Sequence, residues 1–271
     1  MQKPFILSNG LQIPSIGFGT WLIPQERACL RVSQALKIGY RHIDSAQDYG
    51  NEAGVGEAIR KSGLARESIF VTTKIKASIK SYGEAKSSLE ESFSKLGLNY
   101  IDLVLIHAPQ PWEELRGPKK YYEENRAVWA CMEEFYKDGR IKSIGVSNFL
   151  EDDLEHLMSH CSIKPMVNQI CLNIGDTDSE LVEYCQKQGI LVEAYCPIAH
   201  GKALSDPFVI TMAKKYSVSP AVLCLAYALE LGTLPLPKSE NPEHMKENLD
   251  FSLSISPEDM ESLKRWKHQD Q

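Results

Sequence analysis

The sequence predicts an α/β fold, namely a (β/α)8 TIM barrel with a short N-terminal β-hairpin that caps the bottom of the barrel. Three observations lead to this prediction: the chain has 271 residues, short apolar runs alternate with longer amphipathic segments, and an Asn-Gly pair precedes the first run. Strict alternation of strands and helices favours parallel strands covered on both faces. One such barrel takes about 250 residues. We therefore expect a single domain over residues 1–271.

The first expected element is the hairpin. Asn9 and Gly10 lie between two short apolar stretches. Asn-Gly is the strongest two-residue hairpin signal, because both positions tolerate positive φ. The hairpin should therefore precede the barrel.

Eight apolar or β-branched runs follow and are the candidate strands. Their lengths suit buried strands, and polar or turn residues bound them. They cover residues 15–19, 40–44, 68–74, 100–107, 141–148, 165–169, 190–195 and 233–239. Helical segments between them include residues 26–38, 84–96, 123–137, 150–159, 179–188 and 220–231, and Pro257 starts a short terminal helix.

A doubly wound sheet is the alternative fold. Such a sheet usually carries Gly-x-Gly-x-x-Gly at its first strand-to-helix turn. Neither Gly-Phe-Gly-Thr-Trp-Leu at 17–22 nor Gly-Val-Gly-Glu-Ala-Ile at 54–59 completes that pattern. The barrel is therefore favoured.

Composition narrows the functional class. The net charge is −6, from 30 basic and 36 acidic residues. No basic stripe suited to a phosphate backbone is present, so nucleic acid is not expected as a partner. No apolar run approaches the roughly 18 residues of a membrane span, and no signal peptide is recognised. Seven widely spaced cysteines without a CxxC pair favour free thiols. We expect a cytoplasmic monomer.

Polar residues gather where the predicted strands end. In a barrel the loops after the strands surround one mouth, so these side chains should share a pocket. One carboxylate and one imidazole are too few to predict a metal site. His156 and His160 lack the glutamate of the HExxH zinc pattern, so no metal is expected. The strand-end residues are Asp44, Lys74, His107, Ser147, Asn148, Gln169, Tyr195, Lys238 and Ser239, with Tyr49 one loop beyond Asp44.

The mixture of Asp44, Tyr49, Lys74 and His107 indicates proton transfer. The pKa of a tyrosine, about 10, must fall by roughly 3 units, about 4 kcal/mol, to cycle near pH 7. A lysine cation about 4 Å away supplies roughly this amount at an effective dielectric near 20. Asp44 would keep Lys74 charged, and we expect Lys74 to lower the pKa of Tyr49. His107 would orient the substrate oxygen or help pass a proton.

Several motifs together resemble those of the aldo-keto reductase superfamily. They are Asp-Ser-Ala-Gln-Asp-Tyr-Gly-Asn-Glu at 44–52, Phe-Val-Thr-Thr-Lys at 70–74, Ile-Asp-Leu-Val-Leu-Ile-His-Ala-Pro at 101–109, Gly-Val-Ser-Asn-Phe at 145–149, Asn-Gln at 168–169 and Leu-Pro-Lys-Ser at 236–239. The resemblance covers nearly the whole chain. It implies a barrel that binds NADPH without a Rossmann domain and transfers hydride between the nicotinamide and a carbonyl carbon.

The resemblance also assigns residues to roles. Asp44, Tyr49, Lys74 and His107 would form the catalytic tetrad, with Tyr49 as general acid in the reduction of an aldehyde or ketone. NADPH would be preferred, with NADH as a weaker alternative. Trp21, Tyr49, His107 and Trp112 would line the substrate pocket. The implied cofactor contacts are Thr20, Trp21, Asp44, Ser147, Asn148, Gln169, Tyr195, Cys196, Lys238, Ser239, His244, Glu247 and Asn248.

The chain also departs from the family pattern. His244 stands where an arginine usually joins Lys238 at the 2′-phosphate, and Glu240 adds a negative charge. These changes weaken the expected preference for NADPH. Ala108 stands where many members have tryptophan, and the short C-terminal tail implies an open pocket.

Two alternatives remain at this point. An aldolase-like barrel would use Lys74 as a Schiff-base nucleophile, although pairing with Asp44 disfavours a neutral amine. A redox-sensing or structural barrel would bind nicotinamide and turn over slowly. The small-molecule carbonyl itself is not named by the sequence.

Overall fold

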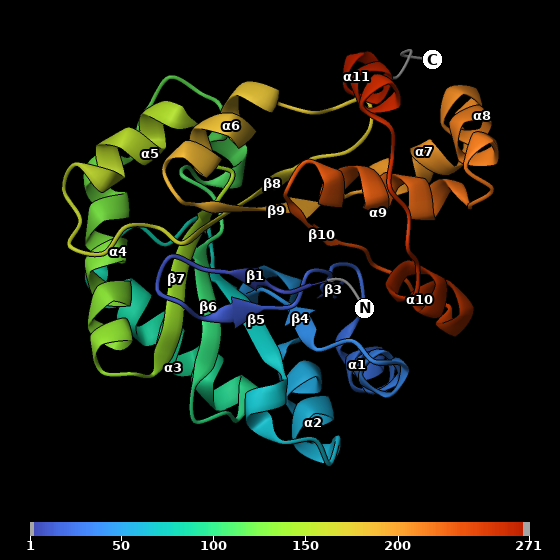
Figure 1. Ribbon diagram of the computed structural model, residues 1–271. Coiled ribbons are helices and arrows are strands. Elements are labelled where there is room, and N and C mark those ends of the chain that lie inside the picture. Colours follow the sequence, from blue (N-terminus) through green and yellow to red (C-terminus); the bar gives the residue numbers. More distant parts are fainter. Residues whose placement is uncertain (1–2, 268–271) are drawn as a thin grey trace.

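The computed structural model describes residues 3–267 and shows a barrel of eight parallel strands surrounded by helices (Figure 1). The first and last strands meet, because Gly17 N–H donates to Pro235 O (3.1 Å) and Gly19 N–H donates to Pro237 O (3.0 Å). The predicted (β/α)8 barrel is therefore confirmed. Around it the strands keep their chain order: β3 (Phe18–Gly19), β4 (His42–Asp44), β5 (Phe70–Ile75), β6 (Ile101–Ile106), β7 (Ile141–Ser147), β8 (Val167–Cys171), β9 (Leu191–Tyr195) and β10 (Leu234–Leu236).

The N-terminal hairpin is also present. Strands β1 (Phe5–Ile6) and β2 (Gln12–Ile13) pair antiparallel, and Gly10 between them has a φ of 85°. Leu7 and Ile13 of this hairpin share a buried apolar cluster with Phe70 and Val167, which begin β5 and β8. The hairpin therefore covers the amino-terminal end of the barrel and leaves the other mouth open.

Helices form the outer layer, and every helix predicted from the sequence is found with its ends shifted by at most two residues. The described residues contain α1 (Gln25–Ile38), α2 (Glu52–Lys61), α3 (Tyr82–Leu96), α4 (Tyr122–Lys137), α5 (Glu151–Met158), α6 (Ser179–Lys187), α7 (Lys202–Ser205), α8 (Pro207–Lys215), α9 (Pro220–Glu230), α10 (Pro242–Leu249) and α11 (Pro257–Arg265). Short 3-10 turns are η1 (Gln47–Tyr49), η2 (Arg66–Ser68), η3 (Trp112–Glu114) and η4 (Ala199–Gly201).

Helices α7, α8, α10 and α2 lie outside the segments predicted from the sequence, and α2 contains two glycines, which lower helix propensity. The structure shows why glycine is needed there. A Cβ on Gly54 would lie 2.7 Å from Ala28 Cβ, and a Cβ on Gly56 would lie 2.0 Å from Leu96 O. Close packing of α2 against α1 and the end of α3 therefore requires both glycines.

Within residues 3–267, no single helix has the length and apolar composition of a membrane span. The helices α8 and α9 reach that length only together, across a bend of 81°.

Candidate active site

The open mouth of the barrel holds a cavity of about 640 Å³. Its wall is built from strand ends, since Asp44, Ser147 and Tyr195 are the last residues of β4, β7 and β9. The sequence-predicted residues that line it are Trp21, Asp44, Tyr49, His107, Trp112, Ser147, Asn148, Gln169, Tyr195, Cys196 and Lys238. Strand geometry thus brings together residues that lie more than 200 positions apart in the chain.

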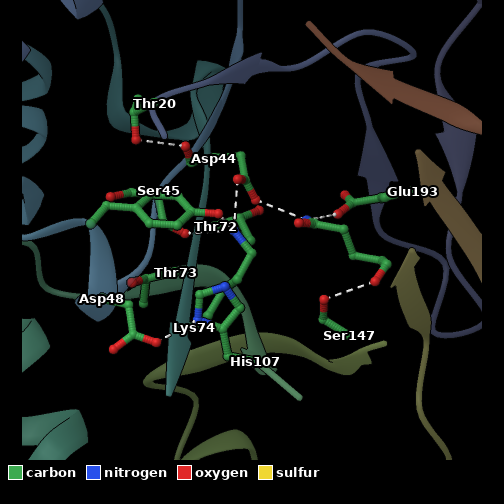
Figure 2. A network of polar contacts seen from close by, with 12 residues as sticks. Thr20, Asp44, Ser45, Asp48, Thr72, Thr73, Lys74, His107, Ser147 and Glu193 are labelled. Carbon is green, nitrogen blue, oxygen red and sulfur yellow. Dashed lines mark hydrogen bonds and ion pairs between the residues drawn. The ribbon is translucent and has the colours of Figure 1, made fainter. Parts of the chain in front are cut away.

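Lys74 lies beneath the cavity floor on β5 and is fully buried. Its Nζ donates to Asp44 Oδ1 (2.6 Å), to Ser45 O (2.8 Å) and to the Tyr49 hydroxyl (3.3 Å) (Figure 2). These three contacts use all three N–H donors of an ammonium group. Lys74 is therefore held as a fixed cation beside Tyr49.

Neighbouring charges and burial shift the pKa of Lys74 in opposite directions. Burial alone would lower the pKa of its amine, but Asp44 and Tyr49 outweigh this effect and raise the pKa above its ordinary value. Lys74 is consequently protonated at neutral pH.

Tyr49 corrects one expectation from the sequence. Burial is the largest influence on the pKa of Tyr49 and raises it, while Lys74 opposes that rise and Asp44 adds to it. The net direction is upward, so Lys74 does not bring the free phenol close to neutrality. The expectation considered the attraction of a cation and omitted the removal of the phenol from water. Tyr49 is thus a protonated phenol poised beside a cation.

The turn that presents Tyr49 is short. Tyr49 ends η1, and Gly50 follows with a left-handed φ of 66°. Glycine adopts this conformation without steric cost. Gly50 therefore lets the backbone turn tightly just after Tyr49.

His107 follows β6 and contacts a residue that the sequence analysis does not select. Its Nδ1 lies 3.1 Å from Asp48 Oδ2, and Trp112 Nε1 donates to the same oxygen at 3.1 Å. The His107 ring also packs edge-on against Trp112 and Tyr49. The sequence signal for this contact is the carboxylate of Asp48, which stands next to Tyr49 in the motif at residues 44–52. Asp48 ties the histidine to the exposed tryptophan at the rim.

The predicted carboxamide ligands bond to one another. Ser147 Oγ donates to Gln169 O (2.8 Å), and Asn148 Nδ2 donates to His107 O (3.0 Å) and Ser147 Oγ (3.1 Å). The Tyr195 hydroxyl donates to Asn148 Oδ1 (2.8 Å). These contacts fix one wall of the cavity relative to His107.

Gln169 connects this wall to the tetrad and to a second buried acid. Its Nε2 donates to Asp44 Oδ2 (2.9 Å) and to Glu193 Oε2 (2.7 Å). Glu193 on β9 is fully buried, and burial raises its pKa to about 8, with Asp44 adding to the rise. Glu193 is therefore a neutral acid at pH 7. Glu193 is not predicted as a site residue from the sequence, although a charge inside the apolar run 190–195 is a signal.

Thr20 and Trp21 are neighbours in the chain, but Thr20 is buried and Trp21 is exposed. Thr20 is fully buried and its Oγ1 donates to Asp44 O (2.9 Å), so it supports the end of β4. Trp21 is 43% exposed and packs edge-on against His200, whose Nε2 lies 3.3 Å from Cys196 Sγ. Trp21, His200 and Cys196 thus form one part of the cavity rim.

Lys238 also lines the cavity and belongs to a charge cluster. Glu240 Oε1 accepts from Lys238 Nζ (3.2 Å), and Glu240 Oε2 lies 2.8 Å from an Arg27 nitrogen and 3.4 Å from Arg31 Nε. Glu240 therefore points toward Lys238. The two arginines on α1 are missed by the sequence analysis because helix positions carry no strand-end signal.

The remaining predicted cofactor residues lie around α10. Ser239 Oγ accepts from the Asn241 N–H (3.1 Å) just before the helix. His244 and Glu247 are exposed on α10, whereas Asn248 is buried. Within residues 3–267, Asn248 Oδ1 has no hydrogen-bond partner. None of these four residues lines the main cavity.

Comparisons with known proteins place this geometry in a family. The model of the Aldo/keto reductase family matches residues 15–207 and 208–267. The chain belongs to the aldo-keto reductase family. This aldo-keto reductase is accordingly an oxidoreductase, and small carbonyl compounds are the substrates of the class.

Three similar proteins show the extent of the match. Glyoxal reductase of Bacillus subtilis (strain 168) is 39% identical, over 95% of this chain and 90% of the relative. The crystal structure of an aldo/keto reductase from Brucella melitensis has a TM-score of 0.90 at 38% identity, covering 98% of this chain and 99% of that chain. The Bombyx mori aldo-keto reductase in complex with NADP has a TM-score of 0.87 at 33% identity, covering 98% and 93%.

Proposed function

We propose that this aldo-keto reductase uses NADPH to reduce aldehyde or ketone carbonyls to alcohols, with Tyr49 as the general acid. One observation carries the proposal: the Tyr49 hydroxyl lies 3.3 Å from a fully buried Lys74 that Asp44 holds at 2.6 Å. Tyr49 and Asp44 also line the cavity. A phenol backed by a fixed cation suits protonation of a carbonyl oxygen.

In this proposal Tyr49, Lys74 and Asp44 have separate roles in proton transfer. NADPH, when bound, supplies a hydride to the carbonyl carbon. Tyr49 donates a hydrogen bond to the carbonyl oxygen and then its proton, which leaves a phenolate. The Lys74 cation stabilises the negative charge on the oxygen and then on the phenolate. Asp44 and Ser45 keep that cation in place, so little reorganisation is needed during reaction.

The residues present fit a bound NADPH. Ser147, Asn148 and Gln169 would hold the carboxamide, and Tyr195 would offer its ring face to the nicotinamide. Asn248 carries a buried amide oxygen without a partner among residues 3–267, which would accept from the adenine amino group. The NADP complex of the Bombyx mori relative supports this cofactor.

The cation cluster would serve the 2′-phosphate. Lys238, Arg27 and Arg31 converge on Glu240, and a phosphate would offer them stronger acceptors. NADH lacks this phosphate and would be the weaker cofactor.

The proposal is tested by NADPH oxidation with a reactive aromatic aldehyde. We expect clear turnover in the wild type and at least a ~100-fold loss in Tyr49→Phe, because general acid catalysis contributes about 10²–10⁴-fold. NADPH affinity, measured by fluorescence quenching, should be unchanged in Tyr49→Phe. Tyr100→Phe, before β6 at the other end of the barrel, is the matched control and should behave as wild type.

Three results would overturn the proposal. Wild-type turnover in Tyr49→Phe would remove the general acid, and tight NADPH binding without turnover would favour the redox-sensing alternative. Borohydride trapping of substrate on Lys74 would favour the aldolase-like alternative. The three hydrogen bonds of Lys74 and its raised pKa argue against a nucleophilic amine.

A further inference from the structure

Asp48 holds the histidine that faces the carbonyl site. His107 Nδ1 and Trp112 Nε1 each lie 3.1 Å from the same Asp48 Oδ2. The His107 ring sits 4.9 Å from the Trp112 ring and 5.7 Å from the Tyr49 ring, edge-on to both. Asp48 approaches the His107 ring from one side (Figure 2). His107 also lines the cavity. The orientation of His107 is therefore fixed.

This contact determines which nitrogen carries the ring proton. The pKa of Asp48 lies below its ordinary value, because burial raises it less than hydrogen bonds from His107 and Trp112 lower it. An ionised carboxylate only accepts hydrogen bonds, so His107 Nδ1 must donate. A neutral imidazole carries a single N–H, so its Nε2 is then an acceptor.

We propose that Asp48 is a positioning residue that keeps the proton of neutral His107 on Nδ1, so that the ring presents an acceptor to the carbonyl site. This inference rests on the proposed carbonyl reduction. A carbonyl oxygen is itself an acceptor and gains nothing from an unprotonated Nε2. The doubly protonated ring donates from both nitrogens. His107 therefore assists reduction only as imidazolium, whereas neutral His107 accepts the hydroxyl of an alcohol and assists oxidation.

The groups around His107 set the balance between these two forms. Those that face it are Asp48 and Tyr49 on η1, Asp44 at the end of β4 and Lys74 on β5. Burial is the largest influence on the pKa of His107 and lowers it, Lys74 lowers it further, and the two carboxylates oppose this shift. The net direction is downward. The acceptor form thus dominates at neutral pH.

Two variants of Asp48 separate its acceptor oxygen from its charge. Asp48→Leu removes the acceptor at similar side-chain size. Asp48→Asn keeps an amide oxygen that accepts from both His107 and Trp112 but carries no charge. The side chain of Asp48 is 29% exposed, so both replacements avoid the closed core.

The first measurement does not depend on activity. Long-range ¹H–¹⁵N NMR of the labelled protein reports the tautomer of each histidine, and His107→Gln identifies the signal. At pH 8 we expect the Nδ1–H tautomer in the wild type and Asp48→Asn, and the Nε2–H tautomer in Asp48→Leu. An Nε2–H tautomer in the wild type overturns the proposal, even if the protein reduces carbonyls. The expected tautomers without any turnover would instead refute the proposed function.

The second measurement is the pH profile of kcat/KM for reduction. The wild type should lose activity as pH rises and the imidazolium deprotonates. Asp48→Leu should not show this loss of activity with rising pH, because its neutral His107 ring already donates from Nε2–H. Its ratio of activity at pH 8 to activity at pH 6 should therefore be several-fold higher than that of the wild type. Asp48→Asn should still lose activity as pH rises, but at a lower pH than the wild type, because the charge that stabilises the imidazolium is gone. Identical profiles in all three proteins would refute the positioning role.

Discussion

Two charged clusters hold their charges in different ways: the reaction end, with Lys74 and Asp44, and the tail end, with Lys238, Glu240 and Arg27. At the reaction end, Lys74 is fully buried and Asp44 is almost so, and strands β4 and β5 fix their separation. At the tail end, the side chains of Arg27, Lys238 and Glu240 are 48%, 35% and 22% exposed. Breaking a buried pair costs about 3–5 kcal/mol, whereas an exposed pair contributes about 0–1 kcal/mol. The reaction end is therefore rigid, and the tail end is free to exchange partners.

This difference separates chemistry from cofactor choice. Proton transfer requires a cation that stays in one place, which buried hydrogen bonds provide. Binding a 2′-phosphate requires cations that can leave Glu240 for a new anion. Substitutions at the reaction end should therefore change turnover and stability, while those at the tail end should change cofactor preference alone.

The largest effect is expected from Lys74→Met. It removes the cation behind Tyr49, so reduction should fall by about 100-fold or more. It also leaves the Asp44 carboxylate buried without its partner, so the free energy of unfolding should fall by about 3–5 kcal/mol. Steady-state kinetics and urea unfolding measure the two losses.

A double variant separates those losses. Asp44→Asn combined with Lys74→Met removes both charges, so it should regain part of the stability and none of the activity. A single variant Lys74→Met that is as stable as wild type would show that the reaction end is not the rigid, charge-paired core described above.

Glu193→Gln tests the buried acid next to the tetrad. The pKa of Glu193 is raised from 4.5 to about 8 in the folded protein, so folding favours its neutral form. Wild-type stability should therefore decline as pH rises from about 5 to 8, by at most ~1.4 kcal/mol per pH unit from this one group. The amide cannot ionise and still accepts from Gln169, so the variant should lack this decline.

Urea unfolding between pH 5 and pH 8 measures this effect, and the advantage of the variant should grow with pH. Glu243→Gln, at an exposed position on α10, is the matched control and should parallel wild type. Parallel curves for Glu193→Gln and wild type would mean that Glu193 ionises in the fold as it does in the unfolded chain.

The sequence predicts the reaction end better than the tail end for a physical reason. Asp44, Lys74 and His107 each lie at the end of an apolar strand or just beyond it, and barrel geometry directs such residues to one mouth. Tyr49 follows Asp44 by one short turn. The hydrophobic pattern of the strands thus encodes both the fold and the tetrad.

Other residues lack such a signal. Glu193 lies within its strand, where alternation alone does not say which side chain contacts Gln169. Arg27 and Arg31 lie on α1, and their meeting with Glu240 depends on how the first helix packs beside the last strand. Asp48 is part of the motif at residues 44–52, but only the folded structure shows that its carboxylate contacts His107. Long-range packing, and not local pattern, decides these contacts.

A smaller effect is expected at the tail end from Glu240→Gln. Removing this charge frees three cations for the 2′-phosphate, so the ratio of kcat/KM for NADPH to that for NADH should rise about fivefold, or ~1 kcal/mol. Activity with NADH should stay near wild type, and the gain should shrink at high salt. Equal changes with both cofactors, or the same gain in Glu243→Gln, would show that Glu240 does not compete with the phosphate.

The smallest effect is expected from His244→Arg. His244 is exposed in the first turn of α10, three residues beyond the Asn241 that caps the helix. Arginine carries a permanent charge and a forked set of donors suited to phosphate, but it also places a cation at a helix N-terminus, which costs about 0.3–1 kcal/mol. The cost at the helix end is the same with either cofactor, so it lowers stability and leaves the ratio unaffected. Because position 244 is exposed to solvent, the added charge should raise the NADPH to NADH ratio only about twofold to threefold, below the gain from Glu240→Gln. Kinetics at pH 8 keep the phosphate fully ionised. His160→Arg, two residues beyond the end of α5, makes the same chemical change at an exposed site that does not line the main cavity, and it should leave the ratio unchanged. If His244→Arg changes the ratio no more than His160→Arg does, position 244 does not face the phosphate, and Lys238, Arg27 and Arg31 account for cofactor preference without it.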